Sequence, residues 1–320
     1  MTSMGTPEKM GETTIGVDIS KDHLDACRWP GGETLRVRND PAGHKALIRW
    51  FAKGVTRVVF EPTGAYHRGL EHALGRAGIA FSKVNPARAR RFAEAVGTHA
   101  KTDRIDASLL ARLGALLEPA LAAPKPAVLD DLAELHLARA ALVRDRTAAK
   151  NRAERLTLPL LRRQRARALR AIERALAEVD AAIAALIAGD EILARKAAIL
   201  CSIPGISAIT AAAILAGMPE LGELEPGDAA SLAGLAPVTR QSGQWKGPAR
   251  IGGGRADLRR ALYMPALTAV RFNPDLKVFY DRLRTAGKPA KLALTAVMRK
   301  LLILANALLR DGRKWEITRP

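Results

Sequence analysis

Apolar residues in the first 120 positions come in short runs that are separated by turn residues and by stretches with helical spacing. Runs with the length of β-strands occur at 14–19, 24–29, 35–37, 57–60 and 79–84. Helices are expected at about 41–53, where Asp40 precedes Pro41 as a cap, at about 66–76, and from Pro86 and Asp103 onward. This alternation predicts an α/β domain over residues 13–123.

The pattern changes after Pro124-Lys125-Pro126, which we interpret as a linker. Residues 129–198 are almost all helix formers, and apolar residues from Leu169 to Leu186 alternate spacings of three and four, which is a heptad seam. A helical hairpin and a dimerising coiled coil both satisfy this seam. We therefore predict a helical, coiled-coil region over 124–198.

Gly and Pro return in the last third of the chain. Helices are expected there at 207–217, 256–271 and 289–310. Residues 199–320 are therefore predicted to form a third, mostly α-helical domain.

The net charge of the chain indicates the class of its binding partner. The 320 residues include 51 Lys and Arg against 32 Asp and Glu, a net charge of +19, which favours a polyanion and above all nucleic acid. Cys27 and Cys201 stand far apart in apolar stretches, so we expect two buried free thiols in a reducing cytoplasm. The first twelve residues lack a hydrophobic signal core, and no apolar run reaches the ~18 residues of a spanning helix, so no membrane is expected.

Four carboxylates stand where a sheet edge and a helix start are predicted. Asp18 ends the first apolar run, Glu61 ends RVVF, and Asp103 and Asp106 share one face at the start of a helix. Each alone also fits a turn or helix cap. Together they form an oxygen-only set that suits Mg²⁺ or Mn²⁺, and two such ions about 4 Å apart can drive phosphodiester chemistry. Lys101 and Arg104 flank the last pair and are expected to contact nucleic acid.

A candidate nucleophile, Ser242, stands between Gln241 and Gly243 in a glycine-rich stretch. Basic residues that could hold a phosphate surround it: Arg240, Lys246, Arg250, Arg255, Arg259 and Arg260. No His or Lys base adjoins the serine, so the residues alone favour a phosphate-binding loop whose serine only donates a hydrogen bond.

Two further segments favour phosphate contact. Ser202 to Ser207 resembles a helix-hairpin-helix turn with Gly205 in the turn, although Ser207 replaces the usual second glycine. Residues 139–174 hold twelve basic residues against three acids. The densest cluster is Arg162, Arg163, Arg165, Arg167 and Arg170. We expect sequence-independent contact with nucleic acid there, the alternative being a solvated helix face.

Five blocks, taken in order, resemble the DEDD-type insertion-sequence transposases, the insertion-sequence one-ten family. The blocks are GVDISKDHLD, EPTGAYHRGL, KTDRIDASLLAR, SIPGISAITAAAILA and GLAPVTRQSG. The resemblance covers roughly residues 13 to 310, and the order of the blocks is far more specific than any single block. Three strands followed by helix, strand, helix, strand and helix is also the order of a ribonuclease-H-like domain.

The resemblance implies a RuvC-like variant of that fold with metal ligands at Asp18, Glu61, Asp103 and Asp106. It places the nucleophile at Ser242, where Gln241 replaces the first of two serines that relatives often carry. The implied mechanism is similar to that of serine recombinases, with a phosphoserine link to DNA and Mg²⁺ at the carboxylates. Relatives use a non-coding bridge RNA and act as dimers and tetramers. DNA, a guide RNA and further copies of this chain are therefore the expected partners.

Two other functions fit the same residues. A hydrolytic, structure-specific endonuclease of the Holliday-junction type would use the carboxylates alone and would tolerate alanine at Ser242. A non-enzymatic nucleic-acid-binding scaffold would need no divalent metal.

Overall fold

A computed structural model describes residues 13–51, 54–62, 64–97, 103–239, 241–243, 245–247 and 249–317, without the side chains of 103, 104, 245 and 246. The chain divides into two compact units between Pro126 and Ala127, within the region where the sequence predicts a linker. Each unit is described by itself.

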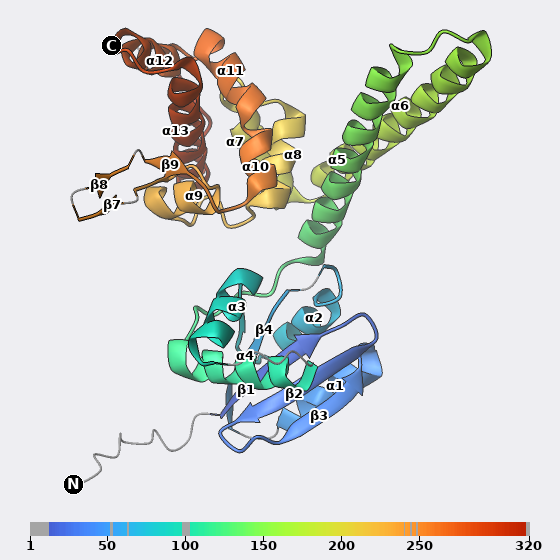
Figure 1. Ribbon diagram of the computed structural model, residues 1–320, viewed down its shortest axis with the longest axis vertical. Helices are drawn as coiled ribbons and strands as arrows, with labels where there is room; N and C mark the ends of the chain where they lie inside the picture. Colours follow the sequence, from blue (N-terminus) through green and yellow to red (C-terminus); the bar gives the residue numbers. More distant parts are fainter. Residues whose placement is uncertain are drawn as a thin grey trace. The chain divides into compact units, whose positions relative to one another are not determined.

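The first unit is built on a five-stranded mixed sheet. Its strands are β1 (Thr13–Ile19), β2 (His23–Trp29), β3 (Thr34–Arg38), β4 (Val55–Phe60) and β5 (Phe81–Lys83). Their order across the sheet is β3-β2-β1-β4-β5 (Figure 1). Strands β1, β2 and β3 are antiparallel neighbours, whereas β4 pairs parallel to β1 and β5 parallel to β4. All five predicted strands are confirmed.

Helices cover both faces of this sheet. They are α1 (Pro41–Phe51), α2 (Arg68–Arg76), α3 (Pro86–Ala95) and α4 (Asp103–Leu117). On one face, Ile15 and Val17 share a core with Leu47 of α1 and Leu70 of α2. On the other face, a smaller core of Val59, Val84, Leu110 and Leu113 lies under α4. The predicted cap of α1 is confirmed, because Asp40 Oδ1 accepts a hydrogen bond from the Gly43 N–H at 2.8 Å.

The second unit opens with two long helices, α5 (Ala127–Ala153) and α6 (Pro159–Ala188), which pack against each other as a hairpin (Figure 1). Arg139 Nε binds Asp180 Oδ1 across the pair at 2.5 Å. Pro159 stands at the first position of α6, where its missing N–H costs nothing, so it begins a helix rather than kinking one. Of the two arrangements that the heptad seam allows, the single chain forms the hairpin.

Shorter helices and two small strand pairs complete the second unit. The helices are α7 (Glu191–Ser202), α8 (Ala208–Gly217), α9 (Pro226–Leu232), α10 (Ala256–Ala261), α11 (Tyr263–Phe272), α12 (Pro274–Thr285) and α13 (Ala290–Asp311). The strand pairs are β6 (Pro237–Val238) with β9 (Arg250–Ile251), and β7 (Gln241–Ser242) with β8 (Trp245–Lys246). The single helix expected at 256–271 is wrong: it is divided at Leu262, which places Pro265 in the first turn of α11.

Helix α13 supplies much of the core of the second unit. Four of its side chains are inaccessible to solvent in this core: Val297, Leu301, Leu302 and Ala305. Among the helices that the structure describes, α13 is the one long and apolar enough to cross a membrane by length and composition. More than half of its apolar window is buried inside the protein, as in the core helix of a globular domain.

Candidate active site

Asp18 and Glu61 lie at the carboxyl ends of two adjacent parallel strands. Val17 pairs with Phe60 in the register of β1 and β4, so the two acids are the next residues on neighbouring strands, which are spaced about 4.8 Å apart. Side chains alternate along a strand, and Val59 contributes to the core under α4, so Glu61 projects toward the same face. Both acids are half-buried. The sequence prediction of two strand-end acids is confirmed to this extent.

Helix α4 brings a third carboxylate to the same end of the sheet. A Cβ at Gly16 would lie 2.0 Å from the Ala107 carbonyl oxygen, so only glycine lets the helix backbone approach β1 this closely. Near its other end, Gly114 packs on Val59 and Thr14. The helix therefore runs from the Asp18 end of β1 back toward Thr14, and its first turn, with the half-buried Asp106, lies at the Asp18 end.

Asp103 is the first residue of α4, and its side chain lies outside the described residues, as do Lys101 and the side chain of Arg104. Among the side chains that are described, no group of three or more His, Cys, Asp or Glu is close enough to hold a metal ion. Convergence of the four carboxylates on one metal site therefore stays a prediction. The elements that carry them do meet at one end of the sheet.

A fifth acid at this end of the sheet, Asp25, was not predicted from the sequence. It stands directly opposite Asp18 in the β1–β2 pair, and Arg36 stands opposite Asp25 on β3. Arg36 Nε lies 3.8 Å from Asp25 Oδ2. Like charges opposite each other destabilise a sheet, so this arginine offsets part of the repulsion at the strand end. An acid inside the apolar strand HLDACRW was the available signal.

One asparagine ties together the two loops that follow the strand-end acids. Asn39 Nδ2 donates hydrogen bonds to the Ser20 carbonyl (2.9 Å) and the Tyr66 carbonyl (3.0 Å). Its Oδ1 accepts from His44 Nε2 at 2.8 Å. His44 is buried, and this burial lowers the pKa of its imidazole, with a smaller opposing effect of Asp40.

Ser242 lies on a small hairpin rather than in an open loop. It is exposed on β7 and pairs with Trp245 on β8, and Gly243 in the turn has a φ of +56°, which glycine adopts without strain. Arg240 and the side chain of Lys246 lie outside the described residues, and Arg250 is exposed on β9.

The other arginines near the serine make contacts within the second unit. Arg255 donates to the Gly217 carbonyl at 2.8 Å and pairs with Glu220. Arg259 donates to the Gly253 carbonyl at 2.8 Å, and Arg260 pairs with Asp257. Arg259 thus holds the glycine-rich segment 252–254, and Arg255 joins it to the residues at and after the end of α8, so both have a structural role beside the predicted phosphate contact.

The helix-hairpin-helix-like turn is also explained by packing. Gly205 has a φ of +107°, and a Cβ there would lie 2.7 Å from the Pro265 carbonyl oxygen. Ser207, which replaces the expected second glycine, caps α8 by accepting a hydrogen bond from the Thr210 N–H at 3.3 Å.

The remaining sequence predictions concern the arginines of α6 and the two cysteines, on β2 and α7. Of the five clustered arginines, Arg162, Arg163, Arg167 and Arg170 are exposed on α6, whereas Arg165 is half-buried. Both cysteines are free, and Cys27 is buried as expected. The prediction for Cys201 is wrong, since it is exposed on the face of α7 opposite the buried Ile199 and Leu200.

Comparison with known proteins assigns both parts of the chain to one group. A model of DEDD-type IS110 transposases matches residues 15–179, and a model described as "Transposase IS116/IS110/IS902 family" matches residues 197–281. The pilin gene-inverting protein of Moraxella bovis is 31% identical over 96% of this chain and 98% of its own length, as is that of Moraxella lacunata. The 43.6 kDa protein of insertion element IS110 from Streptomyces coelicolor is 36% identical over 38% of this chain and 31% of its own length.

Proposed function

Because this chain belongs to the IS110 family of transposases, and is therefore a DNA transposase or recombinase, we propose that it cuts and rejoins DNA through a divalent-metal site and a serine nucleophile. The observation that carries the proposal is the meeting of Asp18, Glu61 and the first turn of α4 at one end of the sheet. The first unit acts as a RuvC-like catalytic domain, which its element order supports. The second acts as a transposase domain, with α5 and α6 as a linking hairpin that pairs with another copy as a coiled coil.

The metal ligands in this proposal are Asp18, Glu61, Asp103 and Asp106. Their oxygen-only chemistry fits Mg²⁺ or Mn²⁺, and the half-buried acids on adjacent strand ends repel one another unless a cation neutralises them. When bound, such cations neutralise charge on the scissile phosphate and favour ionisation of the attacking group. The protein's own contribution is to hold the carboxylates on a sheet edge and a helix packed on that sheet.

Ser242 supplies the nucleophile. Its oxygen forms a bond to a DNA phosphorus while the bond from that phosphorus to one DNA oxygen breaks. The serine proton passes to a base, and the departing DNA oxygen takes up a proton. Attack by a DNA hydroxyl on the serine–phosphate link then rejoins the strands and restores the serine. An exposed hairpin suits this role, because the hydroxyl must reach a substrate and a second catalytic group.

The partners follow from the family and the charge. We propose that the chain acts in the cytoplasm as a homo-oligomer, on DNA, with a non-coding guide RNA. The net charge of +19 supports contact with two nucleic acids. The clustered arginines of α6 contact phosphate, and so do Lys101, Arg104, Arg240, Lys246, Arg250, Arg255, Arg259, Arg260 and the turn at Gly205. The Moraxella relatives are named pilin gene-inverting proteins, and inversion of a gene requires strand exchange rather than simple cleavage.

The covalent link to DNA is the direct test. The full chain is incubated with Mg²⁺ and junction DNA, the DNA is digested, and mass spectrometry is used to find a nucleotide adduct. We expect the adduct on Ser242, and its loss with loss of recombination in Ser242→Ala. Ser231→Ala removes an exposed serine from α9 of the same unit and should leave both unchanged. Cleavage that persists in Ser242→Ala without an adduct would identify a hydrolytic nuclease, and DNA binding without any cleavage would identify a scaffold.

A further inference from the structure

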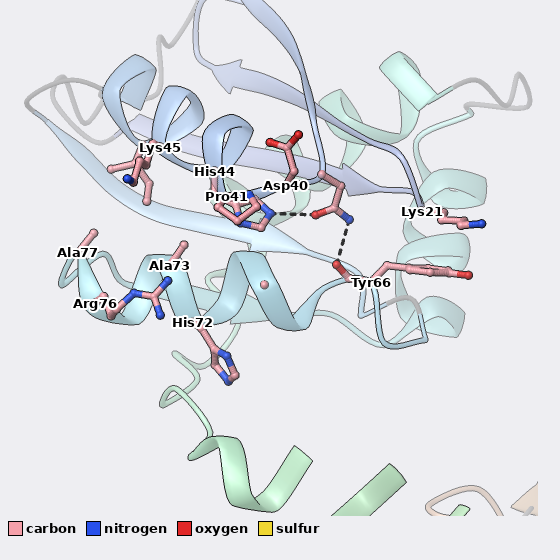
Figure 2. A pocket seen from close by; sticks show the side chains of 13 residues that line it. Lys21, Asp40, Pro41, His44, Lys45, Tyr66, His72, Ala73, Arg76 and Ala77 are labelled. Atoms are coloured by element: carbon pink, nitrogen blue, oxygen red, sulfur yellow. Dashed lines mark hydrogen bonds between the residues drawn. The ribbon is translucent and has the colours of Figure 1, made fainter. Parts of the chain in front are cut away.

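A groove of about 610 Å³ lies between α1 and α2, on the side of the sheet away from α4 (Figure 2). The loop after β1 and the turn before α2 close one end of it. Lys21 and Tyr66 lie toward that end, and Lys45 and Arg76 lie toward the other. Helix α2, which forms one wall, has nine residues and is about 13 Å long. The groove is thus long enough for a short segment of a chain molecule.

The charges of the groove favour an anion. Lys21, Lys45 and Arg76 are exposed side chains that line it. Asp40 is the one carboxylate among the residues that line it, and it already accepts the Gly43 N–H and lies 3.5 Å from Arg38 Nε. A chain of phosphates therefore meets cations at both ends of the groove, and the one lining acid, Asp40, is already paired with Arg38.

An exposed aromatic ring lies at the Lys21 end of the groove (Figure 2). Tyr66 is 44% exposed. Its backbone carbonyl is held by Asn39 Nδ2, and Asn39 is oriented in turn by His44. These bonds hold the main chain at Tyr66, and its exposed ring offers a face on which a flat group can stack.

Cations beside an exposed ring are the combination that binds single-stranded nucleic acid. A duplex keeps its base faces stacked inside, so only an unpaired base can lie on Tyr66. We propose that the α1–α2 groove binds a single-stranded segment of DNA or RNA, with phosphates at Lys21, Lys45 and Arg76 and one base stacked on Tyr66. The identity of the strand as a substrate or guide of the transposase rests on the proposed function.

The groove is joined to the candidate active site through the backbone. Asn39 bridges the carbonyls of Ser20 and Tyr66. Ser20 is two residues after Asp18, and Tyr66 is five residues after Glu61. A strand held in the groove therefore touches the same two loops that carry the strand-end acids. This places a single-stranded segment beside the catalytic end of the sheet without contact to the carboxylates.

Photocrosslinking tests the groove directly. The full chain is mixed, in EDTA, with 20-nucleotide oligo-dT or oligo-rU that carries 5-iodouracil, irradiated, and mapped by mass spectrometry. We expect the crosslink on Tyr66. The strand is DNA if oligo-dT gives this crosslink and RNA if oligo-rU gives it. The double variant Lys45→Ala/Arg76→Ala should lower the Tyr66 crosslink and reduce the salt slope by up to about 1.4, at ~0.7 per lost contact. Arg49→Ala is the matched control, since Arg49 is exposed one turn beyond Lys45 and outside the groove.

Affinity of the two Tyr66 variants separates stacking from charge. Tyr66→Ala should weaken, by about fivefold to a hundredfold, binding of the oligonucleotide that crosslinks. Tyr66→Phe should keep near wild-type affinity. Crosslinks that avoid Tyr66, together with unchanged affinity of Tyr66→Ala and Lys45→Ala/Arg76→Ala, would overturn the groove while leaving the proposed function intact. Groove-dependent binding by a chain that forms no serine adduct would instead overturn the proposed function and leave the groove intact.

Discussion

The close approach of α4 to β1 makes Gly16→Ala the sharpest test of how the candidate active site is built. The new Cβ would lie 2.0 Å from the Ala107 carbonyl oxygen and 2.2 Å from the Ala111 nitrogen. Both are backbone atoms, so no side-chain rotation relieves the clash. Since contacts below 3.0 Å essentially never occur, α4 must move away from β1 by at least about 1 Å.

This displacement should affect both stability and activity. Overpacking of this kind costs about 1–3 kcal/mol of the free energy of unfolding. The first turn of α4, with Asp106, moves with the helix, and a misplacement of about 1 Å at a reacting centre costs on the order of 100-fold in rate. Urea denaturation measures the first effect, and DNA cleavage with Mg²⁺ under conditions where the variant is folded measures the second.

Gly114→Ala is the matched control for the same helix and sheet. Its Cβ would meet the Val59 and Thr14 side chains, at 2.4 and 2.8 Å, near the other end of α4. We expect a loss of stability with a much smaller loss of cleavage rate. Equal rate losses in the two variants, or full activity of folded Gly16→Ala, would refute the idea that this contact positions the catalytic end.

Three further predictions address pH, buried charge and nucleic-acid binding. Burial lowers the pKa values of His44 and His136, and Arg139 lowers the pKa of His136 further. The folded state therefore resists protonation of both imidazoles. Their contribution to stability is complete above the ordinary pKa of about 6.5 and is lost as the pH falls from 6.5 through the lowered pKa values. Urea denaturation at pH 8, 6 and 5 should show this loss, and His44→Gln/His136→Gln should flatten it. Glu71 is 2% exposed and binds Lys83 Nζ at 2.7 Å, so Glu71→Ala should cost about 3–5 kcal/mol in urea denaturation, and a cost below 1 kcal/mol would contradict the pairing. Replacing the five clustered α6 arginines by alanine should reduce the salt slope of duplex binding by up to about 0.9 per lost contact, whereas lysine at all five should preserve it.

The sequence predicted the sheet because its strands carry an unambiguous pattern. Buried runs that end in acids, such as the run before Asp18, leave few alternatives to strands at a sheet edge. The starts of α1 and α3 could also be predicted, because each helix begins at a proline, which follows Asp40 in α1 and Asn85 in α3. The divided helix at Leu262 was not predicted, because helical spacing continues across it and only Pro265 marks the break.

The residues missed at the candidate site act through pairing across strands and loops. The significance of Asp25 comes from a register that places Asp18 opposite it on one side and Arg36 on the other. Asn39 likewise acts on two carbonyls that lie 19 and 27 residues away. Local patterns cannot give such contacts, because they depend on strand order and register, which arise only when the sheet is assembled.

These contacts give the end of the sheet its electrostatic character. Arg36, Asp25 and Asp18 stand opposite one another on β3, β2 and β1, and Glu61 follows β4 on the other side of β1, so this run across the sheet holds an arginine and three acids. Asp106 adds a further acid from the first turn of α4 at the same end of the sheet. In the proposed mechanism, a divalent cation bound where Asp18 and Glu61 adjoin would lower the repulsion between these acids. On the same proposal, DNA would approach this edge with cations bound, while basic residues elsewhere on the chain hold its backbone.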